Sequence, residues 1–187
     1  IMVAFALPCD IELLNSKSSN VGMVRLNFGQ LKLLVVNFYN SRYDKNATST
    51  LDELYSVLTY IREEDRDEVS LVILGDFNTH LCTLCLATEN GHSESLGQTF
   101  HFEHSSQGDS LSKLLGEFNL VNVAEEVDVK GERVFLPTFM GSNSYSTIDY
   151  IFGSGYLGSN ITKFEVFRDD CSDHNKLVCC LEWRVTK

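Results

Sequence analysis

The feature of this sequence that most constrains its fold is a series of short apolar runs, rich in Val, Leu, Ile and Phe. Their lengths are typical of β-strands rather than of helices. The runs are Met2–Leu7, Val21–Leu26, Leu31–Phe38, Val69–Leu74, Val134–Phe139, Ile148–Phe152, Lys163–Phe167 and Lys176–Trp183. Gly29 and Gln30 separate the second run from the third, and this pattern predicts a β-hairpin.

Two further segments have the periodicity of amphipathic helices. From Thr50, a candidate N-cap, apolar residues recur at intervals of three and four as far as Ile61. A second helix is expected from Asp109 or Ser110 to Phe118, because leucines recur there at the same spacing. Strands interspersed with helices predict a mixed α/β domain in which helices cover sheets.

Length and composition limit the class of protein further. A chain of 187 residues with 43% hydrophobic residues is typical of one globular domain, here residues 1–187. The 26 acidic residues outnumber the 15 basic ones, so a contact with nucleic acid would need a local basic patch or a bound cation. The longest apolar run is interrupted by Lys32 and Asn37, and we therefore expect no membrane span.

The cysteines leave two interpretations open. Cys82 and Cys85 form the one short pair, with His80 and His92 close by, but the second matched pair of a typical zinc site is missing. The alternative is unpaired thiols in a reducing compartment. The apolar segment Ile1–Leu7 lacks the basic region and cleavage site of a signal peptide. We therefore expect an intracellular protein that is not secreted.

Polar residues with possible chemistry follow or interrupt three of the apolar runs. Asp76 and Asn78 come directly after a run that ends at Gly75, and in extended backbone two such side chains point the same way. Strand ends are common places for ligand groups in α/β folds. A simple Asp/Asn turn after a strand would have the same sequence, so this cluster alone decides nothing.

The second and third clusters suggest a pair of interacting side chains. Asp149 lies inside an apolar strand, where a carboxylate needs a partner. Asp173 and His174 are adjacent, just before the last predicted strand, and offer an oxygen ligand and an imidazole that can donate a hydrogen bond. We predict that Asp149 orients the His174 ring and fixes its tautomer.

Taken in order, Gly75-Asp-Phe-Asn78, Ile148-Asp-Tyr-Ile151 and Ser172-Asp-His174 resemble the motifs of the endonuclease/exonuclease/phosphatase superfamily. The closer likeness is to the endonuclease domain of non-LTR retrotransposons, because Pro137-Thr-Phe139 and the strand Leu33–Tyr39 also match. The likeness covers nearly the whole chain. It implies an α/β fold, the four-layer sandwich of two packed mixed sheets flanked by helices.

The resemblance also implies a role for each matching residue. Asp76 matches the residue that activates or orients the attacking water, and Asn78 the one that holds this water and the scissile phosphate. His174 matches the imidazole that contacts the phosphate, and Asp149 the carboxylate that orients it. Tyr39 matches a phosphate-contacting tyrosine. These five are the expected catalytic residues.

The metal and the substrate also follow from the resemblance. Asp173 matches a carboxylate at or near a divalent cation, which we expect to be Mg²⁺ or Mn²⁺. Thr138 is expected at the rim of the same site. The implied activity is metal-dependent phosphodiester hydrolysis, in the form of DNA nicking by a nuclear enzyme of the retrotransposon type. Loops such as Thr79–Gln107 set the target preference in this family, and the preference itself does not follow from the sequence.

Two departures from the family pattern limit these expectations. The chain matches the C-terminal three-quarters of the family domain, and we interpret it as N-terminally truncated, without the first strands and helix. The family's metal-binding Glu then has no counterpart, because Glu12 lies in an expected turn; this predicts hydrolysis slower by several orders of magnitude. Thr147 stands where retrotransposon relatives usually have Arg, which weakens expected DNA binding.

Two other functions remain open at this point. One is a catalytically dead sandwich that acts as a binding module, and the other is a superfamily phosphatase that acts on a small phosphoester or phospholipid. A basic groove around Asp76 would favour DNA, and its candidate residues are Arg42, Lys45, Lys130 and Arg133. The oligomeric state does not follow from the sequence.

Overall fold

The computed structural model describes residues 9–16, 18–29, 31–41, 50–65, 69–81, 106–126, 137–141, 145–154, 157 and 160–182. The expected strand Met2–Leu7 and half of the run Val134–Phe139 lie outside these residues, as does the greater part of Thr79–Gln107. The helices are α1 (Thr50–Asp65), α2 (Ser106–Glu117) and α3 (Val123–Glu126). The strands are β1 (Asp10–Leu14), β2 (Val21–Phe28), β3 (Leu31–Tyr39), β4 (Ser70–Asp76), β5 (Leu120–Asn122), β6 (Phe139–Met140), β7 (Tyr145–Ser146), β8 (Asp149–Ser154), β9 (Ile161–Phe167) and β10 (Lys176–Leu181).

The largest sheet is mixed and has six strands in the order β1-β2-β3-β4-β8-β5. Strands β3 and β4 are parallel, whereas all other neighbouring strands in this sheet are antiparallel. The hairpin predicted at Gly29 is confirmed, because β2 and β3 pair around this residue, whose φ is +68°. A mixed sheet of this kind needs a helical crossover between its parallel strands, and α1 supplies it.

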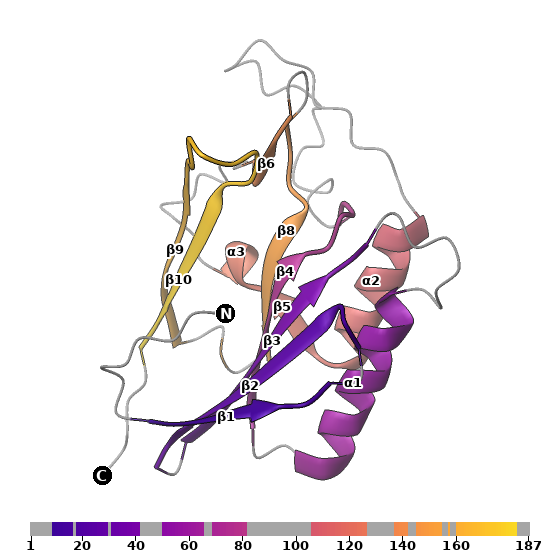
Figure 1. Cartoon of the computed structure of the whole chain (residues 1–187), viewed down its shortest axis with the longest axis vertical. Helices are drawn as coiled ribbons and strands as arrows, with labels where there is room; N and C mark the ends of the chain where they lie inside the picture. Colours follow the sequence, from indigo (N-terminus) through magenta and orange to yellow (C-terminus); the bar gives the residue numbers. More distant parts are fainter. Residues whose placement is uncertain are drawn as a thin grey trace.

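Helices α1 and α2 cover one face of this sheet (Figure 1). The predicted periodicity of α1 is confirmed: Leu51, Leu54 and Leu58 are buried and pack against Val36 and Phe38 of β3 in the main core. Burial of each such side chain stabilises the fold by about 1.5–3 kcal/mol, so the helical stripe fixes α1 on this face.

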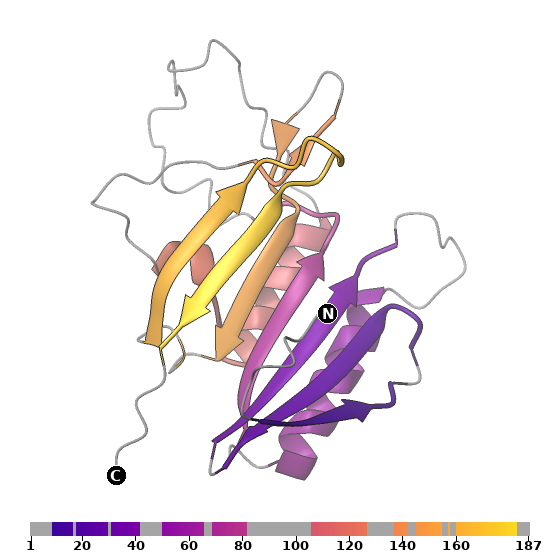
Figure 2. The same ribbon diagram turned by 60° about the vertical axis from the view of Figure 1, so that its left-hand side comes forward.

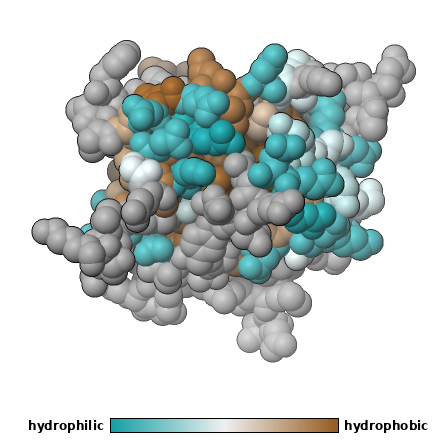
Figure 3. All heavy atoms as spheres, turned by 90° about the horizontal axis from the view of Figure 1, so that it is seen from below, coloured by the Kyte–Doolittle hydropathy of each residue, from teal (hydrophilic) through white to brown (hydrophobic). Residues whose placement is uncertain are grey.

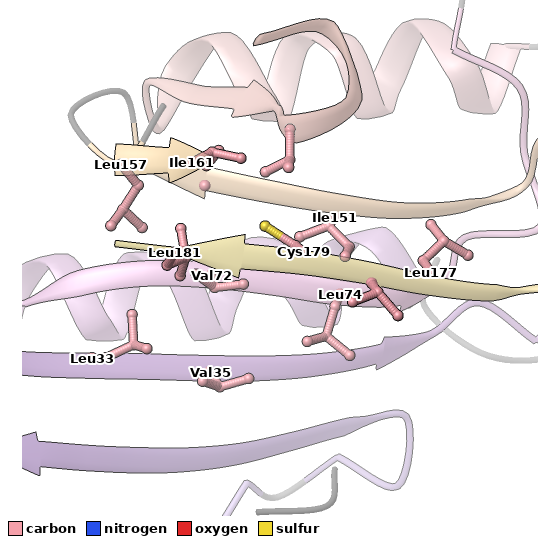
Figure 4. A pocket seen from close by; sticks show the side chains of 13 residues that line it. Leu33, Val35, Val72, Leu74, Ile151, Leu157, Ile161, Leu177, Cys179 and Leu181 are labelled. Atoms are coloured by element: carbon pink, nitrogen blue, oxygen red, sulfur yellow. The ribbon is translucent and has the colours of Figure 1, made fainter. Parts of the chain in front are cut away.

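The antiparallel pair β9–β10 packs on the opposite face (Figure 2). Between the two sheets is an apolar cavity of about 340 Å³, lined by side chains that point inwards from both (Figure 4). Half-buried Cys179 of β10 is among them, and burial, with the neighbouring Cys180, raises the pKa of its thiol to about 11. The predicted class, an α/β fold with two packed sheets and flanking helices, is therefore confirmed.

Some element boundaries differ from those predicted. Helix α2 begins at Ser106 rather than at Asp109 or Ser110, because polar Ser106 and Gln107 precede the apolar stripe but still form its first turn. The turn expected around Glu12 is wrong. Glu12 lies in β1, where its carboxylate forms a salt bridge with the guanidinium of Arg25 of β2, with 3.1 Å between nitrogen and oxygen. This strand alternates polar and apolar residues only from Asp10 to Leu13, too short a pattern to stand out.

The described surface is not uniformly polar. Leu13 of the edge strand β1 is 81% exposed, and Figure 3 shows hydrophobic side chains (brown) open to view beside hydrophilic ones. No helix among the described residues is long and apolar enough to cross a membrane. Every described cysteine (Cys9, Cys171, Cys179 and Cys180) has a free thiol, whereas Cys82, Cys85 and His92 lie outside the described residues.

Gly75 brings the end of β4 unusually close to β3. Its φ is +149°, and a Cβ atom built there would lie 1.8 Å from the carbonyl oxygen of Phe38. Because that obstacle is backbone, it cannot rotate away, and a side chain at this position would push apart the two strands whose ends carry Tyr39 and Asp76.

We expect Gly75→Ala to lower the free energy of unfolding by about 3 kcal/mol or more, because it combines an unfavourable φ with a backbone clash. The matched control is Gly116→Ala in α2, where an added Cβ meets nothing within 4 Å. This control should stabilise the protein by about 0.5–1 kcal/mol through helix propensity. Urea unfolding of both variants measures the difference, and equal stabilities would contradict the close approach.

Candidate active site

Three strand ends place polar side chains in one row. Asp76 of β4 is the register partner of Asp149 of β8, and Tyr39 of β3 is the register partner of Asp76. Residues directly opposite each other on neighbouring strands project from the same face of a sheet. Here this is the face that carries Val72, Leu74 and Ile151, which line the cavity. The row therefore lies at one end of the space between the two sheets.

Two carboxylates directly opposite each other repel, so the row needs groups that offset their charge. Asn78 provides two such groups, its backbone N–H and its side-chain amide. Its backbone N–H donates to one oxygen of Asp76 at 2.9 Å, and its side-chain amide donates to the other at 3.0 Å. To make both bonds Asn78 adopts φ of +47°, a left-handed conformation that Asn tolerates better than most residues.

His174 binds the second carboxylate. Its Nδ1 lies 3.1 Å and 3.0 Å from the two oxygens of Asp149. The His174 side chain is 34% exposed and that of Asp149 only 15%. A carboxylate accepts at this distance when Nδ1 carries the proton, so Nε2 of the neutral ring is free to accept or, once protonated, to donate. The structure thus brings together the two residues that the sequence suggested as an orienting pair.

The segment that carries His174 is tied to β6. The Met140 N–H donates to the carbonyl of Asp173, the Asn175 N–H donates to the carbonyl of Thr138, each at 2.7 Å, and the Phe139 ring lies edge-on to His174. At the far side of this segment, a hydrogen bond from Lys176 and one from the Cys171 N–H lower the pKa of Asp169.

Thr138 was expected at the rim of the site, but the structure places it underneath. It is 2% exposed, and its hydroxyl oxygen accepts from the N–H groups of Ile148 and Asp149 at 3.1 and 3.0 Å. These two bonds fix the backbone just where β8 begins. Thr138 therefore positions Asp149 through its backbone, from the buried side, instead of facing a ligand.

Asp76, Asp149 and His174 offer donor atoms that all lie within 4.8 Å of one another. Carboxylate oxygens are the ligands that Mg²⁺ and Mn²⁺ prefer, whereas an imidazole is typical of Zn²⁺ and other softer ions. The two carboxylates of this group therefore fit a hard divalent cation. Asp173, the residue expected to bind the metal, is exposed and is not part of this group.

The remaining candidates divide into two kinds. Tyr39 is 46% exposed, so its phenol is open to a ligand at the edge of the row. The basic residues expected around Asp76, namely Arg42, Lys45, Lys130 and Arg133, lie outside the described residues.

The sequence analysis did not identify Asn40 and Thr50 as part of the site, and both are buried next to the Asp76–Asn78 segment. The sequence held one indication of their role: each is a polar residue at the end of an element that packs in the core, Asn40 after β3 and Thr50 at the start of α1.

Solved structures of DNA-processing enzymes have this arrangement of layers. The chain superposes on the endonuclease domain of TRAS1, a telomere-specific non-LTR retrotransposon, with a TM-score of 0.62 and 20% identity, over 95% of this chain and 69% of that one. For a 3'-5' exonuclease from Neisseria meningitidis the TM-score is 0.60 at 16% identity, over 93% and 71%. For an AP endonuclease from Archaeoglobus fulgidus it is 0.53 at 20% identity, over 86% and 65%.

The fold is therefore the α/β sandwich of the endonuclease/exonuclease/phosphatase superfamily. Within this class, the sequence profile of the endonuclease-reverse transcriptase family matches residues 33–178. The chain belongs to this family. No protein with a curated description matches the sequence.

We expect Thr138→Val to lower the free energy of unfolding by about 2 kcal/mol or more, because two buried N–H groups lose their acceptor while the shape is kept. Thr138→Ser retains the oxygen and should cost less. Thr162→Val on exposed β9 is the surface control and should change stability by under about 0.5 kcal/mol. Thermal unfolding compares the three, and a Val variant as stable as the Ser variant would contradict this role.

Proposed function

We propose that this chain is a metal-dependent phosphodiesterase that nicks DNA in the manner of retrotransposon endonucleases. The observation that carries the proposal is the row at the strand ends: Asp76 and Asp149 face each other, Asn78 binds the first and His174 binds the second. Such a set can hold a water, a phosphate and a cation within a few ångströms.

In this proposal Asp76 and Asn78 act on the nucleophile. Asp76 takes a proton from, or orients, the attacking water, since a carboxylate at a strand end is an acceptor open to the ligand side. Asn78 already uses its amide on Asp76 and on the carbonyl of Asn40, at 3.0 and 2.8 Å, and its side-chain oxygen is an acceptor for the same water.

His174 acts on the phosphate. With Nδ1 bonded to Asp149, the ring is fixed, and its Nε2 when protonated can donate to a phosphoryl oxygen as negative charge develops there. Asp149 stabilises that protonated ring. Tyr39, half exposed at the edge of the row, contributes a phenolic donor to the same phosphate.

A divalent cation fits this site, with the carboxylates of Asp76 and Asp149 as the candidate ligands, because their oxygens lie within 4.8 Å of one another. Asp173 remains a proposed ligand from its exposed position beside His174. When bound, Mg²⁺ or Mn²⁺ neutralises charge on the phosphoryl oxygens. This neutralisation matters for a protein of net charge −11 that acts on a polyanion.

DNA is the substrate that the family favours, and a nuclear location follows for an enzyme of this type. The acidic surface gives one reason to keep a second candidate, hydrolysis of a small phosphoester, because such a substrate needs no basic groove. The two candidates share the catalytic residues and differ in the substrate that is cleaved.

The test is nicking of supercoiled plasmid at millimolar Mg²⁺ or Mn²⁺. We expect slow conversion to the open circle, stopped by EDTA and reduced by about 10² or more in Asp76→Ala and His174→Ala, because each removes a group that acts on the reacting phosphate. Asp170→Asn is the matched control: this carboxylate is 84% exposed and pairs with Arg168.

Nicking that persists in both Ala variants would contradict the proposal, as would folded protein without metal-dependent cleavage of either plasmid or bis(p-nitrophenyl) phosphate. Cleavage of the small ester without nicking would favour the second candidate.

A further inference from the structure

We infer that Asn40, held in place by Thr50, is a positioning residue that sets the geometry of Asp76 and Asn78. The inference rests on the proposed function and adds to it a determinant in the core, at the start of α1. Both residues are buried, Asn40 at 3% and Thr50 at 7% exposure, and neither is placed to touch a substrate.

Asn40 makes a hydrogen bond to each of three consecutive residues. Its backbone N–H donates to the carbonyl of Asp76 at 2.8 Å, its side-chain amide donates to the carbonyl of Phe77 at 2.7 Å, and its own carbonyl accepts from the side chain of Asn78 at 2.8 Å. One residue at the end of β3 thereby holds the whole turn that follows β4.

Phe77 and Thr50 together hold the Asn40 amide in one orientation. The NH₂ group donates to the carbonyl of Phe77, and the Thr50 hydroxyl donates to Oδ1 of Asn40 on the other side. A carbonyl can only accept, and this assigns the amide orientation without ambiguity. Without the hydroxyl, the buried Oδ1 would lose its donor and the amide would be free to rotate.

The hydrogen bonds of Asn40 and Thr50 act where the backbone of the turn adopts unfavourable dihedral angles. Phe77 lies between the two proposed catalytic residues, Gly75 before it has φ of +149°, and Asn78 after it has φ of +47°. The Phe77 ring is fully buried, and its N–H donates to the carbonyl of Ile148 at 2.8 Å. Its carbonyl is held by Asn40, so losing this bond frees the peptide that joins Phe77 to Asn78.

The matched pair Thr50→Val and Thr50→Ser tests this inference. Val keeps the shape and removes the hydroxyl, whereas Ser keeps the hydroxyl. We expect kcat for phosphodiester cleavage to fall about 10- to 100-fold in Thr50→Val with KM changed less than about twofold, as for other residues that support a metal or catalytic ligand. Thr50→Ser should retain most of kcat.

A second readout does not depend on activity. In ¹⁵N-labelled protein, the side-chain amide signals of Asn78 should shift in Thr50→Val and stay near their wild-type positions in Thr50→Ser. Ile61→Val, a core change on the same helix, controls for a general loss of α1 stability. It should leave both kcat and the Asn78 signals in place.

The inference is overturned if Thr50→Val leaves kcat and the Asn78 signals unchanged, or if Ile61→Val reproduces both changes. Should the wild-type protein cleave no phosphodiester, the proposed function fails. The Asn78 signals alone then decide whether Asn40 and Thr50 set this turn.

Discussion

The site depends on one unfavourable interaction, the meeting of two carboxylates across neighbouring strands. The register of β4 and β8 places Asp76 directly opposite Asp149. Like charges at such positions destabilise a sheet, and a fold selected for stability alone would avoid them. Asn78 and His174 each bind one of the two carboxylates, at distances of 2.9–3.1 Å. The two strand ends are thus a candidate site for a cation.

Much of the nearby core serves to keep this arrangement in place. Thr138 holds the start of β8 from below, and Asn40 holds the turn after β4. Gly75 lets β4 approach β3 more closely than a side chain would allow. The three residues are far apart in the sequence, but each acts on backbone within two residues of Asp76 or Asp149. A site with opposed charges is thus supported by hydrogen bonds and packing in the layer beneath it.

Much of the fold and of the candidate site could be predicted from the sequence, for clear physical reasons. Strands and α1 follow from apolar periodicity, which is a local property, and Asp76, Asn78, Asp149 and His174 were recognisable as polar residues at strand boundaries. The supporting roles of Thr138, Asn40 and Thr50 were not, because these residues act through contacts between segments that are separate in the sequence. Glu12 shows the same limit: an expected turn is a strand, because pairing with β2 outweighs a weak local pattern.

Thermal unfolding with and without Mn²⁺ shows whether the opposed carboxylates Asp76 and Asp149 form a cation site. A cation that binds only the folded state raises the midpoint with concentration, by an amount equivalent to about 2.7 kcal/mol at 100 times its dissociation constant. We expect such a rise for the wild-type protein and its loss in Asp76→Asn, with Asp170→Asn still responding. An equal rise in Asp76→Asn, or none in the wild type, would show that these carboxylates do not bind the cation.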